Sequence, residues 1–272
     1  MIRRNLAQGA TYLTAIAVAA VFLIPMAVIV LTSFKTSAEA SVFNLSLPAV
    51  WQFSNYVEVL ADPSVGRGFV NSLIITLSVT AVTIVVCSLA AFVIARRQTR
   101  LTRSVYVYLL IGIVAPFAFI PAIKVLQALG LANTHLGLIM VDVAGQIPFT
   151  TLLLVGFISQ LPRELDEAAI IDGAGRVRLF FQVIFPLLRP ATLTAVILLF
   201  TYAWNEFQNV LFLVGPEVWT MPMTVFNFQG THTYNYALVC ANLVVTILPL
   251  LLVFVFAQKY ITSGITAGAV KS

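Results

Sequence analysis

A charged stretch at residues 162–190 can do chemistry that the apolar sequence around it cannot. It is the only long stretch after residue 105 with dense charge of both signs. Apolar segments long enough to cross a membrane precede and follow it. Because an unpaired charge at the centre of a bilayer costs roughly 3 kcal/mol or more, this stretch must lie in water or against a soluble partner.

Two short helices are expected within this stretch. Pro162 suits the first position of a helix, and acidic residues fill the first turns, where the helix dipole favours negative charge. Gly173 and its neighbours are expected to end this helix, because glycine takes the left-handed conformation that closes a C-terminus. A second helix is expected over residues 176–184, with Pro186 and Pro190 breaking it before the next apolar segment.

The first helix has a face that is acidic at its ends and apolar at its centre. Helical spacing places Glu164, Glu167, Ala168 and Ile171 on this face. Ala168 and Ala169 are small, so that a partner surface can approach the backbone closely. Such a face fits a groove edged by Arg or Lys on another protein. The alternative is a helix resting on lipid headgroups, although surface-seeking helices are usually rich in Lys and Arg rather than acidic residues.

A second set of polar residues lies inside apolar segments. Residues that share a face at four-residue spacing in one segment are Asp142, Gln146 and Thr150. A later segment carries Tyr202, Trp204, Asn205, Glu206 and Asn209, with Tyr202, Asn205 or Glu206, and Asn209 expected on one face. Buried ionisable residues in such segments usually face a bundle interior or a wet cavity. These residues therefore fit either a translocation path or polar contacts between helices, which contribute about 0.6 kcal/mol each.

The composition predicts an integral, all-α membrane protein. The 272 residues are 60% hydrophobic and 9% charged, whereas soluble domains carry about 25% charged residues. Apolar segments of spanning length divide the chain into six expected membrane helices, at about residues 10–31, 69–95, 106–126, 136–158, 191–214 and 237–257. We find no repeat and no second domain, and expect a single transmembrane domain over residues 1–272.

The basic residues predict the orientation of these helices. With six spans, both termini and residues 162–190 fall on the same side of the membrane. Twelve basic residues lie on that side: Arg3, Arg4, Arg96, Arg97, Arg100, Arg103, Arg163, Arg176, Arg178, Arg189, Lys259 and Lys271. Three lie opposite: Lys35, Arg67 and Lys124. Because basic residues concentrate in cytoplasmic loops, the termini and the charged stretch are expected to be cytoplasmic.

The sequence lacks the residues that several kinds of chemistry require. Cys87 and Cys240 lie inside apolar segments, and His135 and His232 are isolated, so that no metal site is expected. No GxxxxGK[ST] phosphate loop, HExxH motif or GxSxG motif occurs. If ATP drives this protein, a partner must hydrolyse it. The basic charge is a topology signal, and no nucleic-acid partner is expected.

The charged stretch resembles a known family motif. The residues Glu167-Ala168-Ala169, Asp172-Gly173-Ala174, Phe180, Ile184, Pro186 and Pro190 are similar to the EAA loop of ABC-importer permeases. The rest is similar to the maltose-permease-like carbohydrate branch. That likeness rests on Ser33-Phe34-Lys35, Asn55-Tyr56, Asn71-Ser72, Ala203-Trp204-Asn205-Glu206-Phe207 and a tail from Lys259-Tyr260 to Gly268-Ala269-Val270-Lys271.

The resemblance implies a fold and a function. The fold would be a type I ABC-importer permease with six transmembrane helices in the cytoplasmic (inner) membrane. The function would be carbohydrate import, coupled to ATP hydrolysis through a cytoplasmic coupling helix. Residues implied in coupling are Glu164, Glu167, Ala168, Ala169, Asp172, Gly173 and Phe180, with Glu167 pairing with a basic residue of an ATPase.

The resemblance also implies partners. These are a second permease, two ATPase subunits that use ATP and Mg²⁺, and an extracytoplasmic solute-binding protein. The chain itself would be no enzyme and would bind no cofactor. In the polar set, Trp204 could offer a sugar an aromatic face, although sugar contacts can fall on the partner permease and Asn205 and Glu206 also suit a gating role.

Two other classes of protein compete with this interpretation. An ion-coupled secondary transporter would use Asp142 and Glu206 as its own site, would work alone, and would usually contain internal repeats. An intramembrane hydrolase would need a nucleophile and a base, and no such constellation is present.

Overall fold

The computed structural model describes residues 2–97, 99–228 and 235–269, and within these ranges the chain is helical and contains no β-strand. The α-helices are α1 (Ile2–Ser33), α2 (Ser37–Ala40), α3 (Ser54–Ala61), α4 (Pro63–Arg96), α5 (Arg100–Val114), α6 (Phe119–Ala128), α7 (His135–Ile158), α8 (Glu164–Ile171), α9 (Arg176–Arg178), α10 (Phe185–Leu187), α11 (Arg189–Asn205), α12 (Gln208–Leu213) and α13 (Tyr236–Ala269). A π-helical segment (Leu179–Ile184) joins α9 to α10, and a 3₁₀ helix (Met221–Phe228) follows α12.

The chain packs as two compact units. The first contains the described parts of Met1–Gly66 and Thr224–Pro249, and the second those of Arg67–Met223 and Leu250–Ser272. In the first unit, the ring of Phe34 lies 5.0 Å from that of Tyr56. The Asn55 amide donates to the carbonyls of Ser33 and Lys35 at 2.9 and 3.0 Å. The Tyr56 hydroxyl and Ser33 Oγ lie 2.6 Å apart in a hydrogen bond, and burial raises the pKa of Tyr56.

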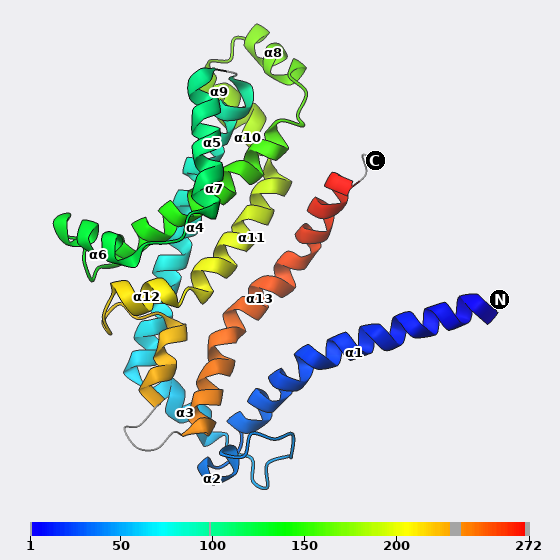
Figure 1. The fold of residues 1–272 in the computed structure, drawn as a ribbon, viewed down its shortest axis with the longest axis vertical. Coiled ribbons are helices and arrows are strands. Elements are labelled where there is room, and N and C mark those ends of the chain that lie inside the picture. Colours follow the sequence, from blue (N-terminus) through cyan, green and yellow to red (C-terminus); the bar gives the residue numbers. More distant parts are fainter. Residues whose placement is uncertain (1, 98, 229–234, 270–272) are drawn as a thin grey trace. The chain divides into compact units, whose positions relative to one another are not determined.

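The second unit is built around α4, α5, α7 and α11 (Figure 1). Helices α5 and α11 both pack against α7. Gly112 of α5 faces Pro148 of α7, and a Cβ at this position would approach the proline ring to 3.1 Å. The first turn of α4 belongs to the first unit, where Asp62 caps the helix by accepting the Ser64 N–H at 2.8 Å and Pro63 occupies the first helical position, where proline is favoured.

Four helices are long and apolar enough to cross a membrane. These segments are Thr11–Ser33, Pro63–Arg96, His135–Ile158 and Tyr236–Ala257. Two further pairs of helices meet the same criteria when each pair is taken together across a bend, which gives up to six spans. The six expected segments therefore agree with the upper count, but two of them are broken.

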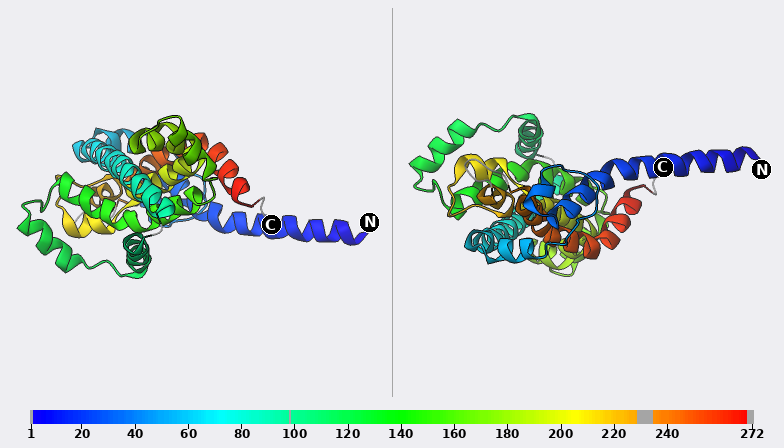
Figure 2. Two further views of the ribbon diagram at one scale, coloured as in Figure 1. Left: turned by 90° about the horizontal axis from the view of Figure 1, so that it is seen from above. Right: turned by 90° about the horizontal axis from the view of Figure 1, so that it is seen from below.

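The third expected span is not one continuous helix, contrary to the prediction for residues 106–126. α5 ends at Val114, and α6 begins at Phe119 after a bend of 117°. Figure 2 shows α6 running in a different direction from α5 within the second unit. Pro116 explains the break, because the residue before a proline is driven to extended backbone, and Ala115 has φ −66° and ψ 128°. Pro121 is tolerated because it lies in the first turn of α6.

The fifth expected span is broken as well, contrary to the prediction for residues 191–214. α11 ends at Asn205, Glu206 is extended, and α12 begins at Gln208. The Glu206 side chain accepts the backbone N–H of Asn209 at 2.8 Å. Such a local bond competes with the helical ladder, which accounts for a break without proline or glycine.

The charged stretch also differs from its prediction in detail. α8 begins at Glu164, with Arg163 as its N-cap, so that Pro162 lies before the helix and not in its first position. Pro186 does not break the second helix, since it lies within α10. The π-helical turns before it widen the backbone, which relieves the clash of a proline ring with a preceding carbonyl. The bend of 76° comes at Leu188, before α11.

The C-terminal segment extends a helix. Residues from Lys259 onward were expected to form a polar tail, but α13 continues to Ala269. No proline lies between residues 250 and 269, so that nothing in this segment forces the helix to stop. Val270 and Lys271 lie outside the described residues, as does His232.

Candidate coupling surface and intramembrane cavity

The helix α8 is fixed to the second unit by an ion pair. Arg96, the last residue of α4, places its Nε 2.7 Å from Asp166 Oδ2, and one of its terminal nitrogens donates to Asp166 Oδ1 at 3.2 Å. Its other terminal nitrogen donates to the Leu161 carbonyl at 3.1 Å. The side chains are only 10% and 15% exposed, so water screens this pair little. α8 is thereby tied to the end of a spanning helix.

Apolar packing holds the other side of α8. Ala169 is buried against a cluster that includes Ile158, Leu179 and Leu188, from α7 and the segment leading to α11. Phe180 is buried too, with its ring 5.5 Å from that of Phe92 on α4. Of the residues predicted for coupling, Ala169 and Phe180 therefore face the protein interior. Their contacts pack α8 and the segment after it against the rest of the second unit.

The end of α8 has the hydrogen-bonding pattern predicted for a glycine stop. Gly173 has φ +81°, a left-handed conformation that side chains with a Cβ adopt only at a cost. Its N–H donates to the Ile170 carbonyl at 3.0 Å, and that of Ala174 donates to the Ala169 carbonyl at 2.9 Å. This pair of bonds is the Schellman closure of a helix, which sets the direction of the chain after α8.

The outer surface of α8 is acidic and apolar. Glu164, Glu167, Ala168 and Asp172 are exposed. α8 and the segment that follows it also carry exposed apolar side chains, of which Ile171 is 85% exposed. The others are Ile170, Val177 and Phe181. We call this combined set the α8 surface. Large apolar side chains clustered with charge at a surface mark an interaction site.

A cavity of about 780 Å³ lies where the two broken helices meet. Its wall is formed by the bend between α5 and α6, by α7, and by the break between α11 and α12. Non-helical backbone at membrane depth is tolerated only inside protein or beside water. Such breaks form solute sites in other transporters.

Four predicted path residues line this cavity: Gln146, Tyr202, Glu206 and Asn209. The expected shared helical face was wrong for Tyr202, Glu206 and Asn209, because the helix breaks between them. The break nevertheless brings all three to one wall. Asn205 does not belong to the lining, and its amide donates to the Thr201 carbonyl at 2.8 Å.

Asp142 lies behind the cavity wall. It is fully buried and outside the lining, but its Oδ1 accepts a hydrogen bond from Asn209 Nδ2 at 2.7 Å. Asn209 is thus held by Asp142 through its side chain and by Glu206 through its backbone N–H. Asp142 can therefore influence the cavity through Asn209.

Trp204 and Thr150 are also buried outside the lining. The indole ring of Trp204 stacks on Phe200, with ring centroids 5.9 Å apart and planes at 7°, and meets Phe69 edge-on at 6.1 Å. Its faces are therefore engaged within the protein. A role for Trp204 as a sugar-stacking surface stays a prediction.

The sequence-based prediction missed the apolar half of the cavity. Phe117, Phe119, Met140 and Phe149 line it alongside the polar residues, and the rings of Phe119 and Phe212 lie 4.7 Å apart. The feature of the sequence that could have indicated this apolar lining was the pair of prolines, Pro116 and Pro121, inside an expected span. A proline that breaks a span exposes backbone and side chains to a cavity.

The described residues contain no group of three His, Cys, Asp or Glu side chains that could hold a metal ion. His135 instead pairs through its Nε2 with Asn71 Oδ1 at 2.8 Å, while the Asn71 amide donates to the carbonyls of Glu217 and Trp219 at 3.0 Å each. Asn71, one of the residues on which the family resemblance rests, therefore links α4 to the loop after α12.

The sequence and the fold of this chain have relatives among known proteins. A sequence model of the family described as "binding-protein-dependent transport system inner membrane component" matches residues 83–266. The chain belongs to this family, and is thus an inner-membrane transport permease. The predicted fold class, an all-helical ABC-importer permease, is confirmed.

Individual relatives cover nearly the whole chain. The melibiose/raffinose/stachyose import permease protein MelC of Bacillus subtilis is 37% identical over 265 residues, covering 96% of this chain and 95% of the relative. The diacetylchitobiose uptake system permease protein NgcG of Streptomyces coelicolor is 34% identical over 253 residues, covering 91% and 84%. The trehalose/maltose transport system permease protein MalG of Thermococcus litoralis is 35% identical over 223 residues, covering 80% of each chain.

A solved structure shares the fold. A chain in the crystal structure of a bacterial ABC transporter involved in the import of the acidic polysaccharide alginate superposes with a TM-score of 0.81 at 21% identity, covering 95% of this chain and 98% of that one. A second structure, of the alginate transporter in complex with an alginate pentasaccharide-bound periplasmic protein, gives a TM-score of 0.71 at 15% identity, covering 95% and 94%.

Proposed function

We propose that this chain is one permease subunit of an ATP-driven importer that moves a mono- or oligosaccharide across the cytoplasmic membrane. It would act with a second, similar permease, two cytoplasmic ATPase subunits that use ATP and Mg²⁺, and an extracytoplasmic solute-binding protein. Both termini and α8 would lie in the cytoplasm, in keeping with the basic residues on that side.

The α8 surface is the observation that carries this proposal. Ile171 is 85% exposed next to the exposed Glu167, and an apolar centre edged by carboxylates fits a cleft with apolar walls and basic rims. The chain has no phosphate loop of its own. An ATPase subunit bound to the α8 surface would cover its exposed apolar side chains and would supply the ATP hydrolysis for which this chain has no phosphate loop.

The contacts beneath α8 support a mechanical role for it. The Arg96–Asp166 ion pair links α8 to α4, and Ala169 links it to the apolar cluster that contains Leu188. Leu188 lies at the bend that leads into α11, and α11 ends at the cavity wall. A movement of α8 driven by closure of the ATPase subunits would therefore reach α4 and α11 through packed contacts.

A carbohydrate cargo is supported by the relatives and by the cavity. The three named relatives transport sugars according to their names. The cavity combines polar groups of Gln146, Glu206 and Asn209 with aromatic rings of Phe117 and Phe149. Hydroxyl groups of a sugar pair with such polar side chains, and its apolar ring faces pack on aromatic ones.

The function can be tested by uptake into vesicles. The permease, its partner permease and the ATPases are reconstituted with ATP inside, and the binding protein and a radiolabelled α-galactoside, chitobioside or maltodextrin outside. We expect uptake of at least one sugar that requires both ATP and the binding protein. In parallel, the chain alone is reconstituted with an imposed proton or sodium gradient, and we expect no uptake.

The two arms separate the proposal from its competitor. Gradient-driven uptake by the chain alone would establish the ion-coupled secondary transporter, with Glu206 in the cavity and Asp142 behind it. ATP-driven uptake of a solute other than a carbohydrate would keep the importer and replace its cargo.

A further inference from the structure

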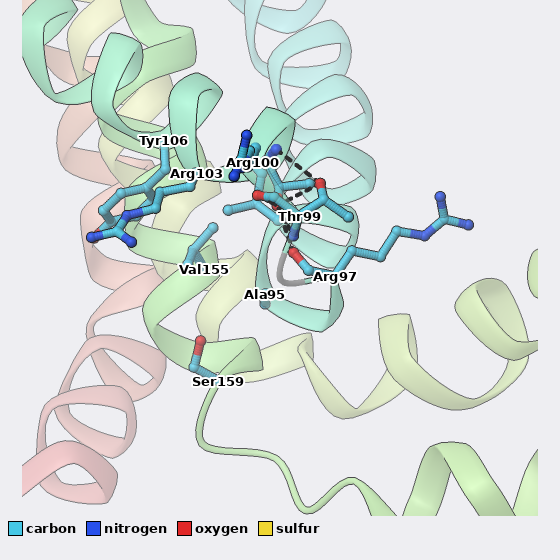
Figure 3. A pocket seen from close by; sticks show the side chains of 10 residues that line it. Ala95, Arg97, Thr99, Arg100, Arg103, Tyr106, Val155 and Ser159 are labelled. Atoms are coloured by element: carbon cyan, nitrogen blue, oxygen red, sulfur yellow. Dashed lines mark hydrogen bonds between the residues drawn. The ribbon is translucent and has the colours of Figure 1, made fainter.

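A basic pocket lies at the end of α4, apart from both the α8 surface and the cavity. Its volume is about 610 Å³, and its lining includes Arg97, Arg100, Arg103 and Tyr106 together with Val155 and Ser159 of α7. Figure 3 shows Arg103 and Tyr106 on one side of this pocket and Arg97 extending to the opposite side. None of the described residues that line it is acidic. The pocket therefore presents permanently charged guanidinium groups with no lining carboxylate to neutralise them.

A shallow, open apolar groove lies on α5, directly after Tyr106 in the sequence. It has a volume of about 440 Å³ and is lined entirely by Val107, Leu110, Ile111, Val114 and Ala115. Arg103, Val107, Leu110 and Val114 follow one another at spacings of four, three and four residues, so that they share one face of α5. The buried Thr102 and Leu109 lie about a third of a turn around the helix from this face.

The dimensions of this face match one leaflet of a membrane. Arg103 and Val114 are separated by about 16 Å along a helix axis, and a hydrocarbon core of roughly 30 Å gives each leaflet about 15 Å. The arginines follow Arg96, at which the candidate span α4 ends. The positive charge thus lies at headgroup level, and the groove lies where an acyl chain would be.

We propose that the basic pocket and the α5 groove together bind one anionic glycerophospholipid, such as phosphatidylglycerol. Arg100 and Arg103 hold its phosphate, because guanidinium groups match phosphate oxygens with paired hydrogen bonds. Tyr106 borders the headgroup, where tyrosine is favoured at the membrane interface. Val107, Leu110 and Val114 contact the acyl chain.

The groove favours a lipid over the other sources of negative charge. A free phosphate ion would occupy the arginines and leave the apolar groove unused. An acidic segment of another protein would fit the arginines but would have to enter the hydrocarbon region to fill the groove. Basic pockets between membrane helices are known to take anionic lipid headgroups, with about 1 kcal/mol for each basic residue near the surface.

Photo-crosslinking in the assembled transporter tests this proposal. The whole complex is reconstituted in vesicles that contain phosphatidylglycerol and phosphatidylcholine, with a trace of either lipid carrying a diazirine on its acyl chain. Crosslinked peptides from α5 are quantified by mass spectrometry. We expect the ratio of phosphatidylglycerol to phosphatidylcholine label on α5 to fall about thirty-fold in R100Q/R103Q, since about 1 kcal/mol for each of the two arginines multiplies to about that factor.

Two matched variants show whether a lower label ratio on α5 results from the loss of arginine charge at the pocket. R189Q removes one basic charge outside the lining of the pocket, and its label ratio should equal that of the parent. R100K/R103K keeps the charge and should keep most of the preference, which separates loss of charge from loss of fold. Equal complex yield of all variants is expected because Arg100 and Arg103 are exposed in the chain.

Three outcomes would overturn the proposal. The first is an unchanged label ratio in R100Q/R103Q. The second is displacement of the phosphatidylglycerol label by inorganic phosphate, which would make the pocket a site for free phosphate. The third is the absence of any lipid label on α5 in the assembled complex, which would assign this face to a protein interface.

Discussion

At the residue scale, Asp142 and Asn209 show how a buried group can act on a cavity that it does not line. The carboxylate of Asp142 holds the amide of Asn209 at 2.7 Å, and Asn209 faces the cavity. If the cavity is the sugar path, the position of the Asn209 amide contributes to sugar binding. Asp142 would then be a positioning residue for the sugar contact.

Substitutions at these two residues should give graded effects on uptake. Asp142→Asn keeps an oxygen that accepts from Asn209 and should change the KM for the sugar least. Asp142→Leu and Asn209→Ala should each raise KM about five- to ten-fold, the equivalent of one lost hydrogen bond of about 1–1.5 kcal/mol. The measurement is ATP-driven uptake over a range of sugar concentrations.

A buried neighbour provides the control for this series. Thr151→Val alters a buried polar side chain of the same helix that does not line the cavity, and its KM should stay unchanged. Normal KM values in Asp142→Leu, together with a reduced yield of assembled complex, would assign Asp142 to interhelical packing instead.

The sequence indicated which polar residues lie near the cavity better than it indicated which side chains surround each residue. Polar residues stand out in apolar segments, and four of those predicted for the path line the cavity: Gln146, Tyr202, Glu206 and Asn209. The burial of Trp204 between Phe69 and Phe200 depends on contacts across more than a hundred residues of sequence. No local pattern in the sequence carries that information.

At the element scale, the breaks in two helices matter more than the helices themselves. The break at Pro116 has a signal in the sequence, since proline restricts its predecessor. The break after Asn205 has none, because it results from the Glu206 side chain capping α12. The number of expected spans was therefore easier to predict than the course of the backbone within them.

The Arg96–Asp166 ion pair is the element contact that most directly tests the role of α8. Arg96→Ala and Asp166→Ala should each reduce uptake, and the double variant should reduce it little further, because both remove the same contact. A double-mutant cycle on thermal unfolding should give a coupling free energy of about 1–3 kcal/mol for this largely buried pair.

The Arg67–Glu217 pair is a control within the same unit. Its oxygen–nitrogen distance is also 2.7 Å, but its side chains are 48% and 78% exposed. Exposed pairs contribute about 0–1 kcal/mol, so its cycle should give a smaller coupling energy and its loss should leave uptake near normal. Equal coupling energies for the two pairs would contradict the special role of Arg96 and Asp166.

At the scale of the whole molecule, the two candidate sites lie on one connected set of helices. α8 is tied to α4 by Arg96 and to the start of α11 by packing, and α11 ends at the cavity. The membrane character and the charged stretch could be predicted from composition and charge alone. The connection between the two sites could not, because it depends on which helices pack together.

The central claim is that ATP hydrolysis in another subunit moves α8, and through it the helices of this chain. Glu167→Lys tests it most directly, because Glu167 is exposed and its side chain forms no hydrogen bond or ion pair with the residues that the structure describes. The variant should insert into the membrane in normal amount while ATP-driven sugar uptake in vesicles falls to background. Glu167→Gln should be intermediate, and Glu58→Lys, the same charge reversal at an exposed residue of α3, should transport normally. Normal ATP-driven uptake by Glu167→Lys would contradict the account.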